Sequence, residues 1–231
     1  MTPRLEAVAV DCLMVRLFEA IDEAHMPWML AASQRLRAVF GARLVELVPS
    51  YTTLMIQFDC SPAEARSLIG EALRDLQPDS AGAGRQMEIP VWYDASVGPE
   101  LKVLAARCGV QESEIIRRHT AREYQVFALG FAPGFAFMGL VEESLASPRL
   151  ATPRKRVAAG SVGIAERQTA AYPALSPGGW NLIGRTPAPL FDRERDGYSL
   201  LQPGDRVRFV AIGRDEFIRL GGDDSPLEEQ P

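Results

Sequence analysis

The first 77 residues alternate between short apolar runs and amphipathic stretches. Residues 5–17 are rich in Val, Leu and Ala and predict one strand. Residues 22–40 place apolar side chains at helical spacing, with Pro27 in the first turn, and Gly41 would end this helix. The chain is therefore expected to open with a strand followed by a helix.

Two more strands and a second helix complete this part of the chain. Residues 44–48 and 52–58 predict the strands. The sequence Ser-Pro-Ala-Glu at 61–64 is a capping box with proline at the first helical position, and it opens a helix that runs to about residue 76. The order β-α-β-β-α predicts a small N-terminal α/β domain over residues 1–77, close to a split βαβ unit.

A linker at residues 78–86 is predicted from its small, polar and glycine-containing sequence. From Gly130 onward, glycine and proline recur between short apolar runs, which is typical of a β-barrel with long loops. We therefore expect an α+β protein with a β-barrel domain at residues 87–220. The acidic tail at 221–231 is expected to be disordered.

Four shorter elements are predicted between the linker and Gly130. Residues 88–93 and 123–129 have the composition of strands, and residues 99–108 and 112–119 have the pattern of helices. Residues 124–141 contain no charge, which reaches the length of a membrane span, but glycines and a proline interrupt them. A strand, a turn and a second apolar segment are the favoured interpretation, with no membrane partner.

Composition narrows the class of protein. Hydrophobic residues make up 47% of the 231 residues, and the net charge is −5, so a basic nucleic-acid-binding face is not expected. Three scattered cysteines and an N-terminal run that contains charges favour a cytoplasmic protein without disulfides. With two histidines in the chain, no metal site is predicted.

Aromatic and cationic loops supply the first binding candidates. In residues 131–137, Pro133-Gly134 predicts a type II turn, and Phe135 is a candidate for the wall of an apolar pocket, although these aromatics could equally be core. Arg149 and Arg154 follow prolines, and stiff loops can hold guanidinium groups ready for a carboxylate or phosphate. A solvated basic loop is the alternative.

The segment 176–181, Ser-Pro-Gly-Gly-Trp-Asn, is a further candidate loop. Ser176, Gly178 and Gly179 would let the backbone approach a ligand. Trp180 would stack on a flat substrate, and Asn181 would hydrogen-bond a carbonyl group. The alternative is a β-turn with a core tryptophan. The nearby spacing of glycines up to 184–186 approaches a nucleotide-binding phosphate loop, but no helix pattern follows it.

Three polar residues are candidates for catalysis. His119 is the only histidine of the predicted barrel domain; a lone histidine is more often structural, but it is the natural candidate if a general acid or base exists here. Gln168 and Tyr172 would point from a strand into the mouth of the barrel. Together with the three loops, they predict a pocket of polar and aromatic groups.

These same segments resemble the family of 5-oxoprolinase B subunits, also known as the KipI or allophanate hydrolase subunit 1 family. The resemblance covers about residues 40–210 and follows the family's order and spacing. The segments that carry it are LVELVPSYTTLMIQFD, His119 with Tyr124, GFAPGFAFMGL, PRLATPRKRVAAGSVGIA, QTAAYPALSPGGWNLIGRTPAPLFD and LLQPGDRVRF.

The resemblance implies a cyclophilin-like barrel after a small α/β domain. It also implies a protein that acts with the A and C subunits of 5-oxoprolinase to open the lactam of 5-oxoproline to glutamate using ATP. ATP would enter through the full complex rather than through this chain, and no biotin is expected. The alternatives are a KipI-like inhibitor of a histidine kinase and a component of urea or allophanate metabolism. A prolyl isomerase is disfavoured, because a fold alone does not carry a function.

One loop departs from the family pattern. Relatives read roughly Gly-x-Gln-Thr-Gly-Ile-Tyr-Pro where this chain has Glu166-Arg167-Gln168-Thr169-Ala170-Ala171-Tyr172-Pro173. If the backbone at Glu166 or Ala170 needs a positive φ, the loss of glycine there would alter the loop.

Overall fold

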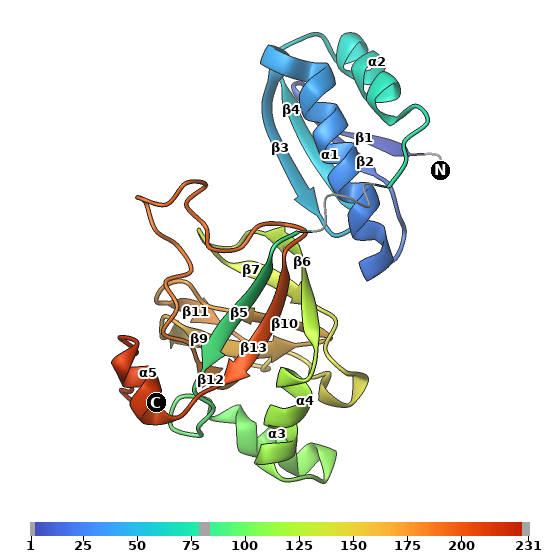
Figure 1. Cartoon of the computed structure of the whole chain (residues 1–231). Helices are drawn as coiled ribbons and strands as arrows, with labels where there is room; N and C mark the ends of the chain where they lie inside the picture. The colour runs from blue at the N-terminus through green and yellow to red at the C-terminus, as the bar shows by residue number, and fades with distance from the viewer. Residues whose placement is uncertain (1–2, 79–83, 228–231) are drawn as a thin grey trace. The chain divides into compact units, whose positions relative to one another are not determined.

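The computed structural model describes residues 3–78 and 84–227, and the chain divides into two compact units, Met1–Gly84 and Arg85–Pro231 (Figure 1). The predicted linker at 78–86 falls largely on residues 79–83, which lie outside the described residues. Its last residue, Gln86, already belongs to a strand. In the described part of the chain, no helix is long and apolar enough to cross a membrane.

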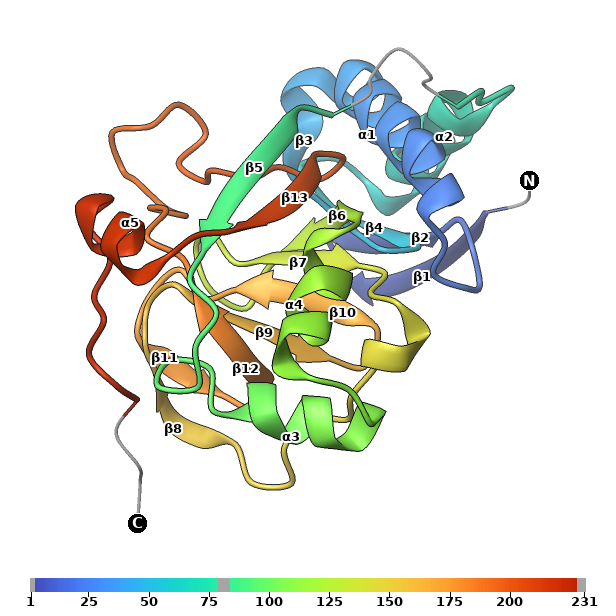
Figure 2. The same ribbon diagram turned by 60° about the horizontal axis from the view of Figure 1, so that its bottom comes forward.

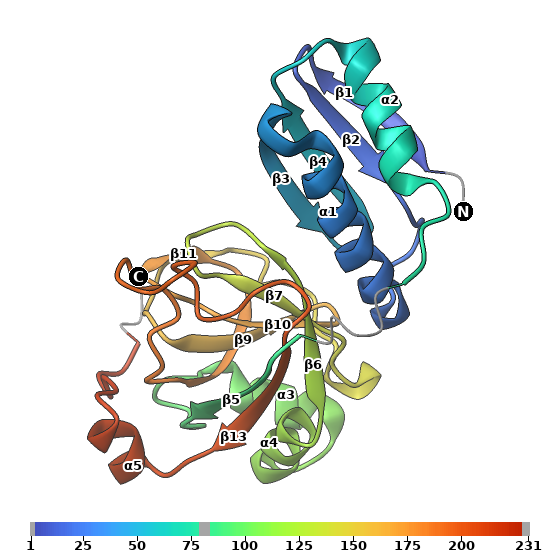
Figure 3. The same cartoon turned by 45° about the horizontal axis from the view of Figure 1, so that its top comes forward.

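The N-terminal unit is a four-stranded antiparallel sheet, in the order β1-β2-β4-β3, with two helices packed on one face (Figure 3). Buried side chains from α1 and α2 form the core with alternate residues of β2 and β4. The elements are β1 (Arg4–Ala9), β2 (Cys12–Arg16), η1 (Glu23–His25), α1 (Met26–Phe40), η2 (Gly41–Arg43), β3 (Leu44–Ser50), β4 (Thr53–Phe58) and α2 (Pro62–Leu73).

The structure confirms the predicted cap of the second helix and contradicts the predicted first strand. Ser61 caps α2 as predicted, because its hydroxyl accepts a hydrogen bond from the Glu64 backbone N–H at 3.2 Å. The single strand predicted at 5–17 is wrong, because the chain turns at residues 10–11 and forms the β1–β2 hairpin. The Asp11 carboxylate fixes this turn by accepting a hydrogen bond from the Gln57 amide at 2.9 Å. The order is therefore β-β-α-β-β-α.

The C-terminal unit is built on a curled seven-stranded sheet in the order β12-β9-β10-β7-β6-β13-β5, which confirms the predicted barrel-like architecture (Figure 2). Its two end strands meet through Trp92 and Arg185, whose backbones exchange two hydrogen bonds of 2.9 Å. Helix α3 packs against β12 and α4 packs against β13. Strands β8 and β11 form a separate two-stranded ribbon.

The bounds of its strands and helices are as follows: β5 (Gln86–Val91), α3 (Glu100–Cys108), α4 (Glu112–Thr120), β6 (Glu123–Leu129), β7 (Ala136–Gly139), η3 (Glu143–Leu145), β8 (Arg154–Val157), β9 (Ser161–Ala165), β10 (Gln168–Ala171), β11 (Ser176–Gly178), β12 (Asn181–Arg185), β13 (Arg206–Ala211) and α5 (Arg214–Arg219).

The barrel wall carries a different apolar cluster on each face, because side chains alternate along a strand. The inner cluster joins strand residues to those of α3 and α4, and it includes Ala136, Ile164, Ala171 and Ile183. The outer cluster contains residues that are adjacent in the sequence to members of the inner cluster. Its members are Phe135, Val157, Ala165, Ala170, Tyr172, Trp180 and Leu182. The alternation of side chains along each strand therefore places one apolar cluster inside the barrel and a second one on its outer surface.

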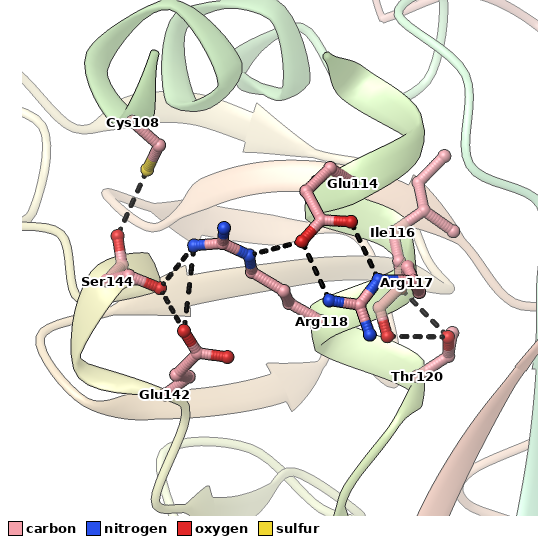
Figure 4. A network of polar contacts seen from close by, with 8 residues as sticks. All are labelled: Cys108, Glu114, Ile116, Arg117, Arg118, Thr120, Glu142 and Ser144. Atoms are coloured by element: carbon pink, nitrogen blue, oxygen red, sulfur yellow. Dashed lines mark hydrogen bonds and ion pairs between the residues drawn. The ribbon is translucent and has the colours of Figure 1, made fainter. Parts of the chain in front are cut away.

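A polar network fastens α3 and α4 to the short helix η3 (Figure 4). The Glu114 carboxylate accepts hydrogen bonds from the guanidinium groups of Arg117 and Arg118, which lower the pKa of Glu114 to about 2. Arg118 also donates to the Ser144 hydroxyl at 2.9 Å, and the Cys108 thiol donates to the Ser144 carbonyl oxygen at 3.0 Å. The network holds in place the helices that carry Glu100 and His119.

The expectation of a disordered tail from residue 221 is wrong for residues 221–227. The Arg185 guanidinium donates to the carbonyl oxygens of Asp223 and Ser225, at 2.6 and 2.9 Å. The Leu227 N–H donates to the Ser96 carbonyl oxygen at 3.2 Å. These contacts fix the segment in spite of its acidic composition. Residues 228–231 lie outside the described residues.

The β9–β10 hairpin explains the departure at Glu166. Ala165 pairs with Gln168, so Glu166 and Arg167 form a two-residue turn, and Glu166 has a φ of 51°. The first central position of such a turn favours glycine when its φ is positive. Ala170 needs no such freedom, because it is a buried residue of β10. The missing glycine therefore costs strain at position 166 only.

Replacing Glu166 with Gly should stabilise the C-terminal unit. Relief of the left-handed strain should raise the free energy of unfolding by about 1–2 kcal/mol. The extra freedom of glycine in the unfolded chain should lower it by about 0.5–1 kcal/mol. We expect a net gain of about 0.5–1 kcal/mol in a urea unfolding curve. The matched variant Arg167→Gly should lose stability. A loss of stability in Glu166→Gly would contradict this account of the turn.

Candidate functional site

A pocket of about 110 Å³ opens on the outer face of the barrel wall, beside the β8–β11 ribbon. It draws on all three predicted loop regions. Its walls are Phe131, Phe135, Phe137, Arg149, Tyr172, Gly178 and Trp180. The expectation that these groups gather at the mouth of the barrel is wrong, because Phe135, Tyr172 and Trp180 belong to the outer cluster.

Aromatic rings make up most of the pocket wall. Phe135 is 1% exposed and Trp180 is 4% exposed, and their rings meet edge to face at 5.6 Å. Phe131 stands at the rim, 62% exposed, with its ring edge-on to Phe135 at 5.2 Å. Of the aromatic wall, only Phe131 is therefore strongly exposed. The pocket offers flat apolar surfaces inside and an exposed aromatic edge outside.

The turn at Pro133-Gly134 positions these rings as the sequence predicts. The Phe135 N–H donates to the Ala132 carbonyl oxygen at 3.0 Å, and Gly134 has a φ of 85°. A Cβ atom at Gly134 would also lie 2.8 Å from the Leu190 carbonyl oxygen. Glycine is thus required here both by the turn and by close packing.

Arg149 supplies the pocket's positive charge. Its side chain is exposed, and it has no ion pair or hydrogen bond with the residues that the structure describes. The backbone is held on both sides, because the Asn181 amide donates to the Pro148 carbonyl oxygen at 2.9 Å and the Leu150 N–H donates to the Gly179 carbonyl oxygen at 2.7 Å. A guanidinium on a fixed backbone is ready for a carboxylate.

Asn181 therefore has a different role from the one predicted. Its amide nitrogen donates to the carbonyl oxygens of Pro148 and Ile164, at 2.9 and 3.1 Å. Both of its N–H groups are used by the protein itself. Asn181 positions the Arg149 loop and has no donor left for a substrate carbonyl.

Tyr172 provides the pocket's phenol group and is 1% exposed. Burial raises the pKa of Tyr172, while a backbone hydrogen bond from Trp180 and the charges of Arg149 and Arg154 oppose the rise. The phenol therefore keeps its proton at neutral pH. Its position depends on Gly178, where a Cβ atom would lie 2.3 Å from the phenol oxygen.

Arg154 is committed to a structural ion pair. Its guanidinium contacts the Glu100 carboxylate at the start of α3. The other oxygen of Glu100 accepts the Leu182 backbone N–H at 2.8 Å. One carboxylate thus ties β8 and β12 to α3. Among the predicted anion-binding residues, Arg154 does not line the pocket, and Glu100 is the partner that sequence reasoning missed.

Three other predicted residues also lie off the pocket lining. Gly179 is not sterically required, because an added Cβ would meet Pro153 at an ordinary 3.6 Å. Ser176 lies on β11 with a buried hydroxyl that has no partner in the described chain. Gln168 begins β10 and Tyr172 directly follows its last residue; four steps of extended chain place them about 13 Å apart.

His119 belongs to the barrel interior, which corrects its assignment as a catalytic acid or base. The side chain is fully buried. Nδ1 lies 2.7 Å from the Tyr93 hydroxyl and Nε2 lies 2.9 Å from the Thr169 hydroxyl. The ring also stacks on Phe209 at 4.7 Å. Burial lowers the pKa of His119 to about 3, so the ring stays neutral as a packed hydrogen-bonding group.

The chemistry of the pocket is that of recognition. Among the described residues that line it, Arg149 supplies a guanidinium group, and the raised pKa of Tyr172 keeps its phenol protonated, so the phenol is a donor rather than a base at neutral pH. The described chain contains no cluster of three or more His, Cys, Asp or Glu side chains that could hold a metal ion. The pocket can bind a small anion with a flat apolar body and donate a hydrogen bond to it.

Comparison with known proteins identifies the family of this chain. The family model for the carboxyltransferase domain, subdomain C and D, matches residues 3–201. The 5-oxoprolinase B subunit of Escherichia coli O157:H7 is 40% identical over 210 residues, 86% of this chain and 94% of that protein. The protein of the same name from Bacillus subtilis (strain 168) is 35% identical over 227 residues, 93% of this chain and 95% of that protein.

A solved structure gives the same result. The crystal structure of TTHA0988 superposes with a TM-score of 0.77 at 37% identity, over 87% of this chain. The chain spans 40% of that protein's length. The chain therefore belongs to the carboxyltransferase domain family of subdomains C and D and, within it, to the family of 5-oxoprolinase B subunits, which confirms the resemblance found in the loops.

The two adjacent glycines give a matched test of the pocket. Gly178→Ala should force the Tyr172 ring to move and cost about 1–3 kcal/mol in urea unfolding, as overpacking does. Gly179→Ala should change stability by less than about 0.5 kcal/mol, as substitutions that disturb no such packing do. Equal effects of the two substitutions would contradict the packing of Tyr172 on Gly178.

His119 predicts a pH-dependent stability. The unfolded histidine titrates near pH ~6.5 and the folded one near 3, so only the unfolded chain gains a proton between them. Stability is full above pH ~6.5 and falls by up to about 1.4 kcal/mol per pH unit as the pH is lowered. Urea unfolding followed by tryptophan fluorescence at pH ~6.5 to ~4.5 measures this slope. An unchanged slope in His119→Gln would contradict the assignment.

Proposed function

We propose that the protein is the B subunit of an ATP-dependent 5-oxoprolinase, which opens the lactam of 5-oxoproline to glutamate together with the A and C subunits. The observation that carries the proposal is the pocket at Arg149, which joins one free guanidinium to an aromatic wall. The similarity to 5-oxoprolinase B subunits of two bacteria supports the same assignment. Free cysteines at three positions are consistent with a cytoplasmic enzyme.

The substrate's chemistry matches the pocket's groups. 5-Oxoproline is a small flat ring with one carboxylate and one amide. Arg149 pairs with the carboxylate, and the lactam ring packs against the pocket's aromatic wall, with the exposed Phe131 ring at the rim. The protonated Tyr172 phenol is a donor for a substrate oxygen. The contribution of this chain is orientation, which holds the lactam in one pose for the reacting groups of the assembly.

ATP does not fit the pocket. Sites for drug-sized ligands have volumes of about 300–1,000 Å³, and this one has about 110 Å³. Its single free guanidinium and aromatic walls also lack the array of backbone N–H groups that cradles phosphates. We therefore assign the nucleotide to the remainder of the complex.

The pocket's rim is also the proposed contact with another protein of the complex. Phe131 is exposed at the rim with a φ of 69°, a left-handed conformation that is costly for a bulky residue. The exposed ring and the pocket beside it together offer apolar surface that a partner protein can cover. The C subunit of 5-oxoprolinase, which would close the pocket over the bound lactam, is the proposed cover.

Reconstitution tests the assignment. The purified chain is mixed with the A and C subunits of the same organism, ATP and 5-oxoproline, and glutamate is measured. We expect glutamate only when all three proteins and ATP are present. No ATP-dependent glutamate from the complete mixture would overturn the proposed function.

Substitution of Arg149 tests its role within that assay. Arg149→Ala should raise the KM for 5-oxoproline by at least about tenfold, because an ionic hydrogen bond contributes about 1.5–3 kcal/mol. Arg149→Lys should recover part of the loss. The control is Arg208→Ala, an exposed arginine on β13, which should leave the KM unchanged. Equal KM values for Arg149→Ala and the unmodified chain would contradict the role of Arg149.

A further inference from the structure

A second cavity, of about 190 Å³, lies under the C-terminal segment of the described chain. It is separate from the Arg149 pocket, and the two share no lining residue. Residues of β8, β12 and the segment 223–227 meet around it. Its lining is Arg156, Ala158, Leu175, Arg185, Asp223, Ser225, Pro226 and Leu227.

Arg185 is the central group of this cavity. It is 2% exposed, which is rare for arginine. Nη1 donates to the carbonyl oxygens of Asp223 and Ser225, while Nε and Nη2 have no hydrogen-bond partner in residues 3–78 and 84–227. A buried ionic donor without an acceptor is costly, so these two atoms call for an acceptor that the described chain does not provide.

The two unpartnered atoms define the shape of that acceptor. Nε and Nη2 form one edge of the planar guanidinium, and their N–H bonds are parallel. Two parallel donors match the two oxygens of a carboxylate in a bidentate pair. A single water or carbonyl oxygen would satisfy only part of this edge.

The surroundings favour a carboxylate over a phosphate. Arg156 is exposed at the cavity and has no ion pair with the described residues, whereas Asp223 contributes one negative charge. Asp224 also acts on Arg185, but it is paired with Arg214, so the three guanidinium groups and two carboxylates leave a single net positive charge, which balances a monoanion. Leu175 and Leu227 add an apolar wall for a short hydrocarbon body.

We propose that this cavity binds a small organic monocarboxylate, with its two oxygens on Nε and Nη2 of Arg185, Arg156 as a second cation, and its apolar part against Leu175 and Leu227. Segment 223–227 forms the outer wall. It is attached by the two Arg185 bonds and by the Leu227 N–H bond to Ser96. A small outward shift of this wall gives the carboxylate access to the guanidinium edge. The proposal stands independently of the proposed function.

Nitrogen-15 amide spectra of the full chain, titrated with sodium butyrate, test this site. We expect saturable shifts at the amides of Leu175, Ser225 and Leu227. Acetate should bind several-fold more weakly, because it lacks two methylene groups that meet the apolar wall. Inorganic phosphate, in a separate titration, should give weaker shifts at these residues than butyrate.

Three variants locate the effect. Arg156→Ala should weaken butyrate binding by about tenfold, and Arg185→Lys should abolish the shifts at Leu227 while the remaining spectrum stays dispersed. Arg149→Ala, in the other pocket, should leave the butyrate affinity within about twofold, because distant sites act independently. If Arg185→Lys does not fold, Arg156→Ala decides alone. No saturable shift at these amides, an unchanged affinity in Arg156→Ala, or tighter binding of phosphate would each overturn the proposal.

Discussion

The Glu100 carboxylate decides which cations of the C-terminal unit are available to a ligand. It is largely buried and binds two groups at once, the Arg154 guanidinium and the Leu182 backbone N–H. Removing one partner of such a pair leaves an uncompensated charge, so the arrangement is strongly fixed. Because Glu100 binds Arg154, the arginines between residues 149 and 156 do not act as one cationic group. Among the described residues, neither Arg149 at the aromatic pocket nor Arg156 at the second cavity has an ion-pair partner.

The same wall of the barrel packs a buried core on one face and forms the candidate pocket on the other. On the inner face, Thr169 holds His119 in a sealed hydrogen-bonded stack, where a neutral ring is the only form that burial tolerates. On the outer face of the same strand and its extension, Ala170 and Tyr172 belong to the cluster that floors the pocket. The alternation of side chains along β10 thus keeps the titratable core away from the ligand without any additional structure.

The sequence predicted which segments line the pocket better than it predicted the contacts of the individual residues. Proline and glycine at 133–134 predicted the turn that sets Phe135, and a loop with Arg149 was expected to hold an anion. Neither local pattern nor spacing distinguishes Arg149 from Arg154. The two differ because Arg154 pairs with Glu100, which comes about fifty residues earlier in the sequence. Which side chains form an ion pair depends on contacts between residues that are distant in the sequence.

Other errors have the same origin. Residues 5–17 are apolar throughout most of their length, and the turn at Asp11 depends on Gln57 from a distant strand. His119 was expected to be catalytic because it is rare, but only the folded chain surrounds it with Tyr93 and Thr169. Gly178 and Gly179 look equivalent in the sequence, and the Tyr172 ring makes only the first one obligatory. Local turns and element types were predictable, whereas tertiary contacts decided function.

The most direct test of the central claim is a crystal structure of the assembled complex with 5-oxoproline bound. We expect the substrate carboxylate about 2.7–3.2 Å from the Arg149 guanidinium, with the lactam ring packed against the aromatic wall of the pocket. A substrate bound elsewhere in the assembly, with Arg149 facing solvent, would contradict the claim.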